Sequence, residues 1–254
     1  MAEIPELAAT LLDDIAGEFP TLLGSNLVGI YLYGSLTQRA FDPRHSDIDV
    51  IVVTARALSD AQFRRVEAWL AQRADDNPWT LRLQVSFFQQ GRLLESTAEP
   101  VACLYQHRVL KRCGSDANCI VWRNVLESGI ILCGPQAAEF VPRITRAMFE
   151  ASLRLELNYL REEIEGADSK WRHRPFYQAY AVLTVCRILY SLTKNKVVAK
   201  PVAARWALKS LPEQWHSLIR QALESRELDG IKALPLEEVA AFIEMARNIN
   251  VRVP

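Results

Sequence analysis

Apolar and polar residues follow strand-like patterns in the first half of the chain. Val28–Tyr33 and Ile48–Val53 are short runs of apolar, β-branched and aromatic residues, the composition of buried strands. Thr80–Phe87 alternates between apolar and polar residues, which predicts a third strand with one polar face. The apolar residues of Ile4–Phe19 recur every three or four positions, with Pro20 just beyond. We therefore expect a helix there that ends before Pro20 and covers the sheet.

The segment from residue 59 to residue 135 mixes helical and extended signals. Ser59-Asp60 is expected to open one helix, and Ser115-Asp116 another that runs to Glu127. Pro100–Cys113 is compatible with a strand or a short helix, and its small basic cluster is expected to be a solvated face, with a nucleotide triphosphate contact as the alternative. Ile130–Cys133 is a short apolar piece closed by Gly134-Pro135.

Helical spacing governs the second half of the chain. Gly166–Arg174 is polar and is expected to be a loop, and the connections elsewhere are short, as in a small helical bundle. We place the boundary near Phe140–Arg146, which gives two domains, 1–140 and 141–254. The five helices predicted in the second domain are Ile144–Gly166, Pro175–Lys194, Lys200–Leu211, Glu213–Glu224 and Leu236–Ile249.

Composition limits the classes of function. The chain has 254 residues, 30 basic and 30 acidic, and a formal net charge of zero, which argues against nucleic-acid binding driven by bulk charge. No apolar run approaches the roughly 20 residues that cross a bilayer, and the N-terminus lacks the features of a signal peptide. The five cysteines have no metal-like spacing and are expected to be reduced thiols. We expect a cytoplasmic protein that binds neither nucleic acid nor membrane.

Two polar motifs lie at the ends of the first two predicted strands. Gly34-Ser35 follows the first strand, where glycine permits close approach to a ligand and the serine hydroxyl can hydrogen-bond a phosphate oxygen. Asp47 and Asp49 begin the second strand and share a face, with Cα atoms about 6.5–7 Å apart. Two carboxylates so close require a cation, and oxygen ligands suit Mg²⁺. The pattern predicts transfer of a phosphoryl-type group; the neighbouring His45 is expected to be a solvated loop residue.

These residues resemble a known signature. The motif of Gly34-Ser35, a short spacer and Asp47-Ile48-Asp49 resembles the signature of the DNA-polymerase-β-like nucleotidyltransferases. The residues around it are most similar to those of the aminoglycoside adenylyltransferases that modify streptomycin and spectinomycin. The resemblance implies an α+β fold, a polymerase-β-like mixed sheet with flanking helices followed by an all-helical C-terminal domain. It implies transfer of AMP from ATP to a hydroxyl of a small molecule, an aminoglycoside in the family. Asp47 and Asp49 would hold Mg²⁺, and Gly34, Ser35 and Ser46 would bind the nucleotide phosphates.

The second half resembles the family's helical domain. The similarity lies in Leu183–Tyr190, in Lys200 with Val202–Ala207, and in Leu211-Pro212-Glu213. In the family, an arginine and a lysine at the places of Arg187 and Lys200 approach the nucleotide phosphates. We expect the acceptor in a cleft between the domains, a usual place for small-molecule sites. The oligomeric state is left open, with a monomer slightly favoured.

The sequence departs from the family at two places. Aligning the strands puts Gln84 where the family carries a third carboxylate, a glutamate taken to deprotonate the acceptor; an amide cannot take a proton near neutral pH. Tyr177 stands where the family has a substrate-binding acid. Two alternatives therefore stay open beside an antibiotic adenylyltransferase. One is a nucleotide-binding protein with weak or no transferase activity, and the other is nucleotidyl transfer to a different acceptor, even a protein side chain.

Overall fold

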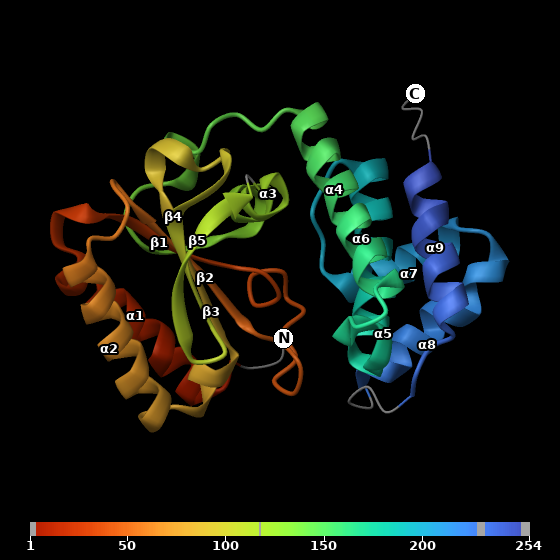
Figure 1. The fold of residues 1–254 in the computed structure, drawn as a ribbon, viewed down its shortest axis with the longest axis horizontal. Helices are drawn as coiled ribbons and strands as arrows, with labels where there is room; N and C mark the ends of the chain where they lie inside the picture. The colour runs from red at the N-terminus through yellow and green to blue at the C-terminus, as the bar shows by residue number, and fades with distance from the viewer. Residues whose placement is uncertain (1–3, 117, 228–231, 250–254) are drawn as a thin grey trace. The chain divides into compact units, whose positions relative to one another are not determined.

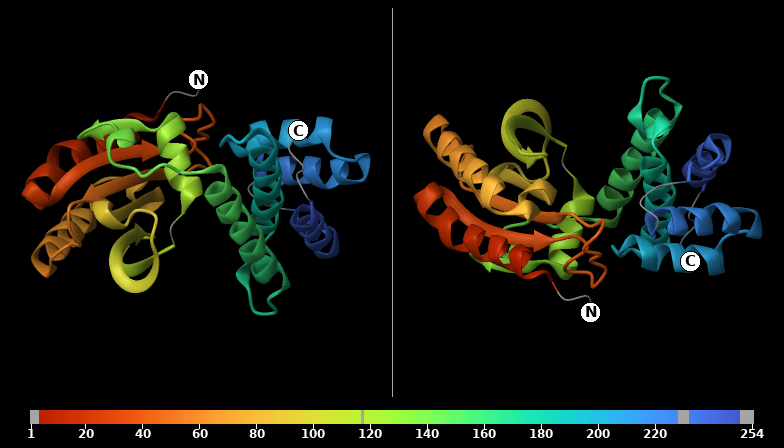
Figure 2. Two further views of the ribbon diagram at one scale, coloured as in Figure 1. Left: turned by 90° about the horizontal axis from the view of Figure 1, so that it is seen from above. Right: turned by 90° about the horizontal axis from the view of Figure 1, so that it is seen from below.

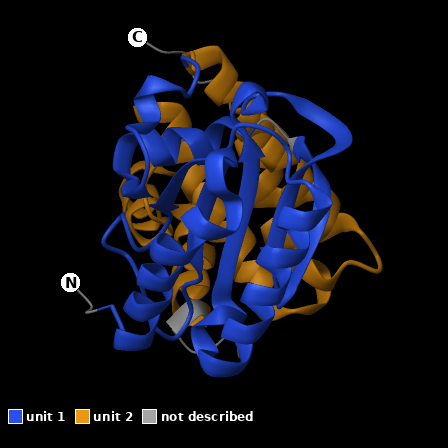
Figure 3. Cartoon of the chain, turned by 90° about the vertical axis from the view of Figure 1, so that its left-hand side faces the viewer, with its two compact units in different colours: residues 1–143 blue, residues 144–254 orange. Residues whose placement is uncertain are grey.

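A computed structural model describes residues 4–116, 118–227 and 232–249 (Figure 1). The chain divides into two compact units, residues 1–143 and 144–254, coloured separately in Figure 3. We call them unit 1 and unit 2. Each has its own core and is considered by itself.

Unit 1 is built on one mixed sheet. Among its described residues, six strands lie in the order β5-β4-β3-β2-β1-β6. Only the β2–β3 pair among these strands is parallel, and the other neighbours are antiparallel. The strands are β1 Leu27–Tyr33, β2 Ile48–Thr54, β3 Leu83–Gln89, β4 Ser96–Gln106, β5 Val109–Asp116 and β6 Ile130–Cys133.

The helices of unit 1 are amphipathic covers for this sheet. Figure 1 shows α1 and α2 side by side, and their apolar stripes share one core with the strands. The ring of Phe19 in α1 lies 5.1 Å from Trp69 in α2 and 6.0 Å from Phe87 in β3. Fully burying a side chain of this kind contributes about 1.5–3 kcal/mol. The α-helices are α1 Glu6–Leu23, α2 Asp60–Asp76 and α3 Cys119–Ser128; the 3-10 turns are η1 Gly24–Asn26, η2 Pro78–Arg82, η3 Gln90–Arg92 and η4 Ala137–Glu139.

The two faces of the sheet have different chemistry. Because side chains alternate along a strand, Ile48, Val50 and Val52 of β2 join the core with α1 and α2. Asp49 therefore belongs to the opposite face. On that face α3 covers the end of β3, where Trp122 and Phe88 have ring centroids 5.5 Å apart. The polar row at the start of β2 and β3 lies on this second face.

Unit 2 is helical throughout its described residues. Most residues of its helix α6 are buried, and α6 contacts α4, α5, α7, α8 and α9, so the bundle forms around it. Figure 2 shows these helices in two further views. No helix in the described part of the chain is long and apolar enough to cross a membrane. The α-helices are α4 Arg146–Glu165, α5 Lys170–His173, α6 Pro175–Lys194, α7 Lys200–Ser210, α8 His216–Glu227 and α9 Leu236–Asn248, with the 3-10 turn η5 Glu213–Trp215.

The fold class predicted from the sequence is confirmed, and the segment left open between strand and helix is a β-hairpin. β4 and β5 pair in an antiparallel register that closes at Gln106 and Val109. The two residues between them, His107 and Arg108, have φ values of 52° and 65°. Two left-handed residues in succession are typical of the tight turn that matches strand twist. The basic cluster of this hairpin is a structural surface, since Arg108 and Arg112 pair with Asp75 and Asp60 of α2.

Several predicted boundaries were wrong, each for a local reason. α1 does not stop before Pro20 but runs to Leu23, since Phe19 and Leu23 are both buried and hold its last turn. The third strand begins at Leu83 rather than Thr80, because Asn77 caps the 3-10 turn η2 through the Trp79 amide. α3 begins at Cys119 and is capped by Asn118, whose side-chain oxygen accepts the Ile120 and Val121 amides. Ser115 and Asp116 instead end β5.

Candidate active site

Strand register brings the predicted site residues of unit 1 together. Asp49 is paired with Tyr33 of β1 on one side and with Gln84 of β3 on the other. In a parallel pair the partners lie side by side and point to the same face, so Gln84 is the neighbour of Asp49, about 4.8 Å away between strands. Asp47 is exposed, directly before β2, and Asp49 is half-buried. The row therefore presents two carboxylates and one amide at an accessible strand end.

Gly34 is fitted against the carboxylate of Asp49. It has a φ of +79°, and a Cβ added there would lie 2.2 Å from Asp49 Oδ2. Only glycine allows both the left-handed backbone and this close approach. The turn that follows is held by Thr37 Oγ1 and the Gln38 amide, both donating to the Gly34 carbonyl. The sequence motif is thus explained by the packing of its glycine against its aspartate.

The hydroxyl of Ser35 lacks a hydrogen-bond partner. Its Oγ is buried, and no atom of the described residues accepts or donates to it. A buried polar atom without a partner costs free energy unless a ligand or water satisfies it. Ser35 directly follows Gly34, and its hydroxyl can donate a hydrogen bond to a phosphate oxygen of a bound ligand.

The loop of residues 41–46, which we call the 41–46 loop, is closed by Asp42. The carboxylate of Asp42 accepts from the Arg44 amide at 3.0 Å and contacts His45 Nδ1 at 3.0 Å. Burial favours the neutral acid, but the hydrogen bonds from His45 and Arg44 outweigh it and hold the pKa of the Asp42 carboxyl well below its usual range. His45 was expected to be solvated, which is wrong, since its side chain is only 5% exposed.

Ser46 serves this loop as well as the site. It is buried, and its Oγ accepts the Asp42 amide at 2.9 Å, while its own amide donates to the Asp42 carbonyl at 2.8 Å. The hydroxyl proton of Ser46 remains available to an acceptor. Sequence reasoning missed two neighbours, Arg82 and Gln106. Arg82 donates to carbonyls of the loop, and Gln106 Nε2 lies 3.5 Å from Gln84 Oε1; a long-range contact of this kind leaves no local sequence signal.

The donor set fits a hard divalent cation bound with a phosphate group. Among the residues that the structure describes, no three His, Cys, Asp or Glu side chains gather into a metal cluster. The carboxylates that this strand end offers a cation are Asp47 and Asp49, with the amide of Gln84 in register with Asp49. Mg²⁺ is commonly bound by one or two carboxylates together with substrate phosphates. Asp47 and Asp49 with the Ser35 hydroxyl match that description.

The other two predicted residues, Arg187 and Lys200, belong to unit 2. Arg187 is half-buried on α6, and its guanidinium has no hydrogen-bond or ion-pair partner in the described part of the chain. Lys200 is the first residue of α7, and its Nζ lies 3.2 Å from the ring centroid of Tyr180 on α6. Tyr180 and Arg187 are seven residues apart, about two helical turns, and so share one face of α6.

The segment expected to be a polar loop before α6 carries a packed aromatic cluster. Its short helix α5 buries Trp171, which stacks on Tyr177 at 5.1 Å and meets Tyr180 edge-on at 5.3 Å. Lys170 Nζ lies 5.0 Å from the Tyr177 centroid, and the nearby carboxylate of Glu163 accepts from Ser169 Oγ at 2.6 Å. Tyr177 is thus in contact with aromatic and cationic groups.

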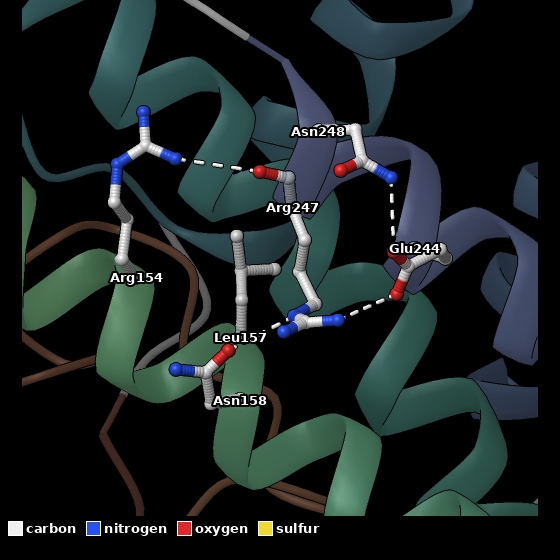
Figure 4. A pocket seen from close by; sticks show the side chains of 6 residues that line it. All are labelled: Arg154, Leu157, Asn158, Glu244, Arg247 and Asn248. Carbon is white, nitrogen blue, oxygen red and sulfur yellow. Dashed lines mark hydrogen bonds and ion pairs between the residues drawn. The ribbon is translucent and has the colours of Figure 1, made fainter.

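A hollow in unit 2 lies away from these residues. Figure 4 shows it between α4 and α9, with a volume of about 210 Å³. Its polar groups satisfy one another: Arg247 donates to Asn158 and Glu244, Asn248 donates to Glu244, and Arg154 donates to the Arg247 carbonyl. These contacts join the two helices, so we assign the hollow a structural role.

Comparison with known proteins finds similarity to aminoglycoside adenylyltransferases. Residues 139–248 match the family model described as the C-terminal domain of aminoglycoside adenylyltransferase. The aminoglycoside (3'') (9) adenylyltransferase of Escherichia coli is 28% identical, over 93% of this chain and 93% of that protein. The spectinomycin 9-adenylyltransferase of Campylobacter jejuni is 25% identical, over 81% of this chain and 80% of the relative.

A solved structure has the same fold. The crystal structure of spectinomycin adenyltransferase AAD(9) from Enterococcus faecialis with ATP and spectinomycin superposes with a TM-score of 0.71. It covers 94% of this chain and 98% of its own, at 16% sequence identity. This similarity confirms the architecture of a mixed sheet followed by a helical part.

The contact between Gly34 and Asp49 can be tested by one methyl group. In Gly34→Ala the new Cβ would lie 2.2 Å from Asp49 Oδ2 at a strained φ of +79°. The carboxylate must then move, so we expect binding of Mg²⁺ with ATP to weaken by about 10-fold or more. Gly91→Ala is the control, because no atom lies within 4 Å of the added Cβ. Titration calorimetry of both variants measures the effect, and wild-type affinity in Gly34→Ala would show that the contact is unimportant.

Proposed function

We propose that this chain, which is similar to the aminoglycoside adenylyltransferases, is a magnesium-dependent enzyme that transfers AMP from ATP to a hydroxyl of a small molecule. The relatives named as adenylyltransferases cover nearly the whole chain, and the carboxylate pair of unit 1 supplies the chemistry. The observation that carries the proposal is the placement of Asp49 against Gly34 and in register with Gln84, while Ser35, the residue after Gly34, has a buried hydroxyl with no partner among the described residues. We place the enzyme in the cytoplasm, where ATP is supplied and its five free cysteines stay reduced.

Unit 1 is proposed as the nucleotidyltransferase domain. Asp47 and Asp49 would hold Mg²⁺, which when bound neutralises phosphate charge and stabilises the attacking and leaving oxygens. Ser35 would donate its unpaired hydroxyl to a phosphate oxygen, and Gly34 would let the backbone come close to it. Ser46 would add its free proton from the closed 41–46 loop. These groups orient the α-phosphate for in-line attack by the acceptor hydroxyl.

Unit 2 is proposed to supply cations. A triphosphate carries several negative charges that two carboxylates alone would repel, so positive side chains are needed as well. Arg187, with no side-chain partner among the described residues, and Lys200, at the start of α7, are the candidates. The support for them is the match of unit 2 to the adenylyltransferase C-terminal domain together with this charge requirement.

Gln84 favours a second candidate, a nucleotide-binding protein with weak or no transferase activity. Its register with Asp49 puts an amide where the resemblance calls for a general base. The amide can ligate or accept a hydrogen bond, but it cannot deprotonate the acceptor. The site would then hold the nucleotide while the chemical step remains slow.

The aromatic cluster favours a different acceptor. A polycationic aminoglycoside is attracted by an acidic surface. The ring of Tyr177 instead contacts Trp171 and the ammonium group of Lys170, and the ring of Tyr180 contacts the ammonium group of Lys200. These lysines oppose a polycation, so a neutral or less cationic hydroxyl compound, or a protein hydroxyl, fits the surroundings better.

One experiment separates the candidates. Purified protein is titrated with ATP in the presence and absence of Mg²⁺, and is then incubated with ATP labelled at the α-phosphate and either streptomycin, spectinomycin, an uncharged polyol or no acceptor. Label on an antibiotic supports the family activity, and label on the polyol or on the protein itself supports another acceptor. Mg²⁺-dependent binding without transfer supports the binding protein. Absence of Mg²⁺-dependent ATP binding would contradict the proposal.

The carboxylate pair gives the first mutational prediction for the proposed function. Asp47→Asn and Asp49→Asn each remove an anionic ligand, so Mg²⁺-dependent ATP binding should fall by about 10–100-fold or be lost. The fold should persist, because removing one of two like charges relieves repulsion. Asp13→Asn, on the exposed side of α1, is the control. Calorimetry measures binding and circular dichroism measures the fold; full Mg²⁺-dependent binding in both site variants would refute the assignment.

The amide gives the second prediction. Gln84→Glu restores a proton acceptor and a negative ligand beside Asp49, and a general base is typically worth about 10²–10⁴-fold in rate. The variant should therefore transfer AMP faster than wild type to any acceptor that is used. Gln106→Glu puts a carboxylate one strand farther away, about 4.8 Å, and should give no comparable gain. Rapid wild-type transfer to streptomycin or spectinomycin, with no gain in Gln84→Glu, would show that Gln84 does not occupy the place of a missing general base.

A further inference from the structure

The 41–46 loop directly precedes Asp47 and is closed by its own hydrogen bonds. Four of its polar contacts close it upon itself: the Asp42 amide to Ser46 Oγ, the Arg44 amide to the Asp42 carboxylate, and the His45 and Ser46 amides to the Asp42 carbonyl. The side chain of Phe41 anchors its start in the core of unit 1. The position of the Asp47 backbone therefore depends on how this loop is tied to the sheet.

Arg82 connects this loop to the sheet. It is the last residue of η2, immediately before β3, and its side chain reaches back to the loop. Its Nη1 donates to the carbonyl of Pro43 and its Nη2 to the carbonyl of Ser46. The second of these carbonyls belongs to the peptide bond that leads into Asp47. One guanidinium thus fixes two points of the loop relative to the strand that carries Gln84.

Aromatic packing holds the guanidinium in place. The Arg82 side chain lies over the ring of Trp79, 4.9 Å from its centroid, and Trp79 lies 5.7 Å from Phe41. Phe41 belongs to the same loop, so the loop contacts Arg82 directly through two carbonyls and indirectly through two rings. A planar guanidinium stacks on an aromatic face and donates two bonds in a fixed geometry, whereas an ammonium group does not.

We propose that Arg82 is a positioning residue for the reaction: it fixes the 41–46 loop so that Asp47 is held in register with Asp49 and Gln84 before the metal and nucleotide bind. This inference rests on the proposed function for the role of Asp47. Arg82 itself is tied to the loop carbonyls and acts through Asp47. Residues that orient metal ligands typically affect metal affinity by about 10–100-fold when they are replaced.

The test compares Arg82→Ala and Arg82→Lys with wild type. Hydrogen exchange of the metal-free protein is measured at the amides of Asp42, Arg44, His45 and Ser46. In Arg82→Ala these should exchange about tenfold faster or more, because the loop opens locally, while the amides of β2 keep their protection. The apparent dissociation constant for Mg²⁺ with ATP should rise by about 10–100-fold. Arg82→Lys should fall between, since one ammonium group cannot reach both carbonyls and stack.

Arg92→Ala is the matched control. Arg92 follows β3 and pairs with Glu95 and Glu99, so its loss removes an arginine near the same strand without touching the loop. It should leave loop exchange and Mg²⁺–ATP affinity unchanged. Unchanged loop exchange or unchanged affinity in Arg82→Ala would overturn the inference. Exchange is measured without metal or nucleotide, so it tests the loop mechanism independently of the proposed function. The proposed function is tested separately, by Mg²⁺-dependent ATP binding in Asp47→Asn.

Discussion

Two carboxylates at one strand end set the main constraint on unit 1. Asp47 and Asp49 carry like charges that repel one another, and a bound cation relieves this repulsion. Both carboxylates lie at an accessible strand end, where Gly34 packs against Asp49. The Ser35 hydroxyl that follows has no partner among the described residues. The proposed magnesium-bound phosphate group would neutralise the carboxylates and accept the Ser35 hydroxyl.

The rest of unit 1 holds this strand end in place. One face of the sheet is packed against α1 and α2, which fixes the register of β2 and β3 and so the pairing of Asp49 with Gln84. A shift of one residue would move Asp49 into the apolar core. On the opposite face α3 packs against β1 and, through Trp122, against Phe88 near the end of β3. Stability and access to the site thus come from the two faces of the same strands.

Much of this could be predicted from the sequence, because it depends on short-range patterns. The alternation in β2 and β3, the Gly34-Ser35 and Asp47-X-Asp49 motifs and the helical spacing of unit 2 are local signals, and they give the fold class. The placement of Gln84 at the third-carboxylate position came from aligning the strands with the family that the sequence resembles, and Gln84 is in register with Asp49 in the structure.

Other features depend on partners distant in sequence or on backbone geometry. The hairpin turn at His107 and Arg108 uses left-handed residues that are neither glycine nor asparagine, so no turn motif marks it. The His45 side chain is shielded from solvent and contacts the Asp42 carboxylate, and Arg82 donates to the carbonyls of Pro43 and Ser46, which lie 39 and 36 residues earlier in the chain. A basic residue before a strand carries no sign of which carbonyls it will reach.

The measurement that tests the central claim most directly is a crystal structure of the protein with Mn²⁺ and a non-hydrolysable ATP analogue. The anomalous signal of manganese locates the metal without reference to the protein model. The account predicts manganese bound to the carboxylates of Asp47 and Asp49, with a phosphate oxygen of the analogue within hydrogen-bond distance of Ser35 Oγ. A nucleotide bound elsewhere, or manganese absent from this carboxylate pair, would contradict it.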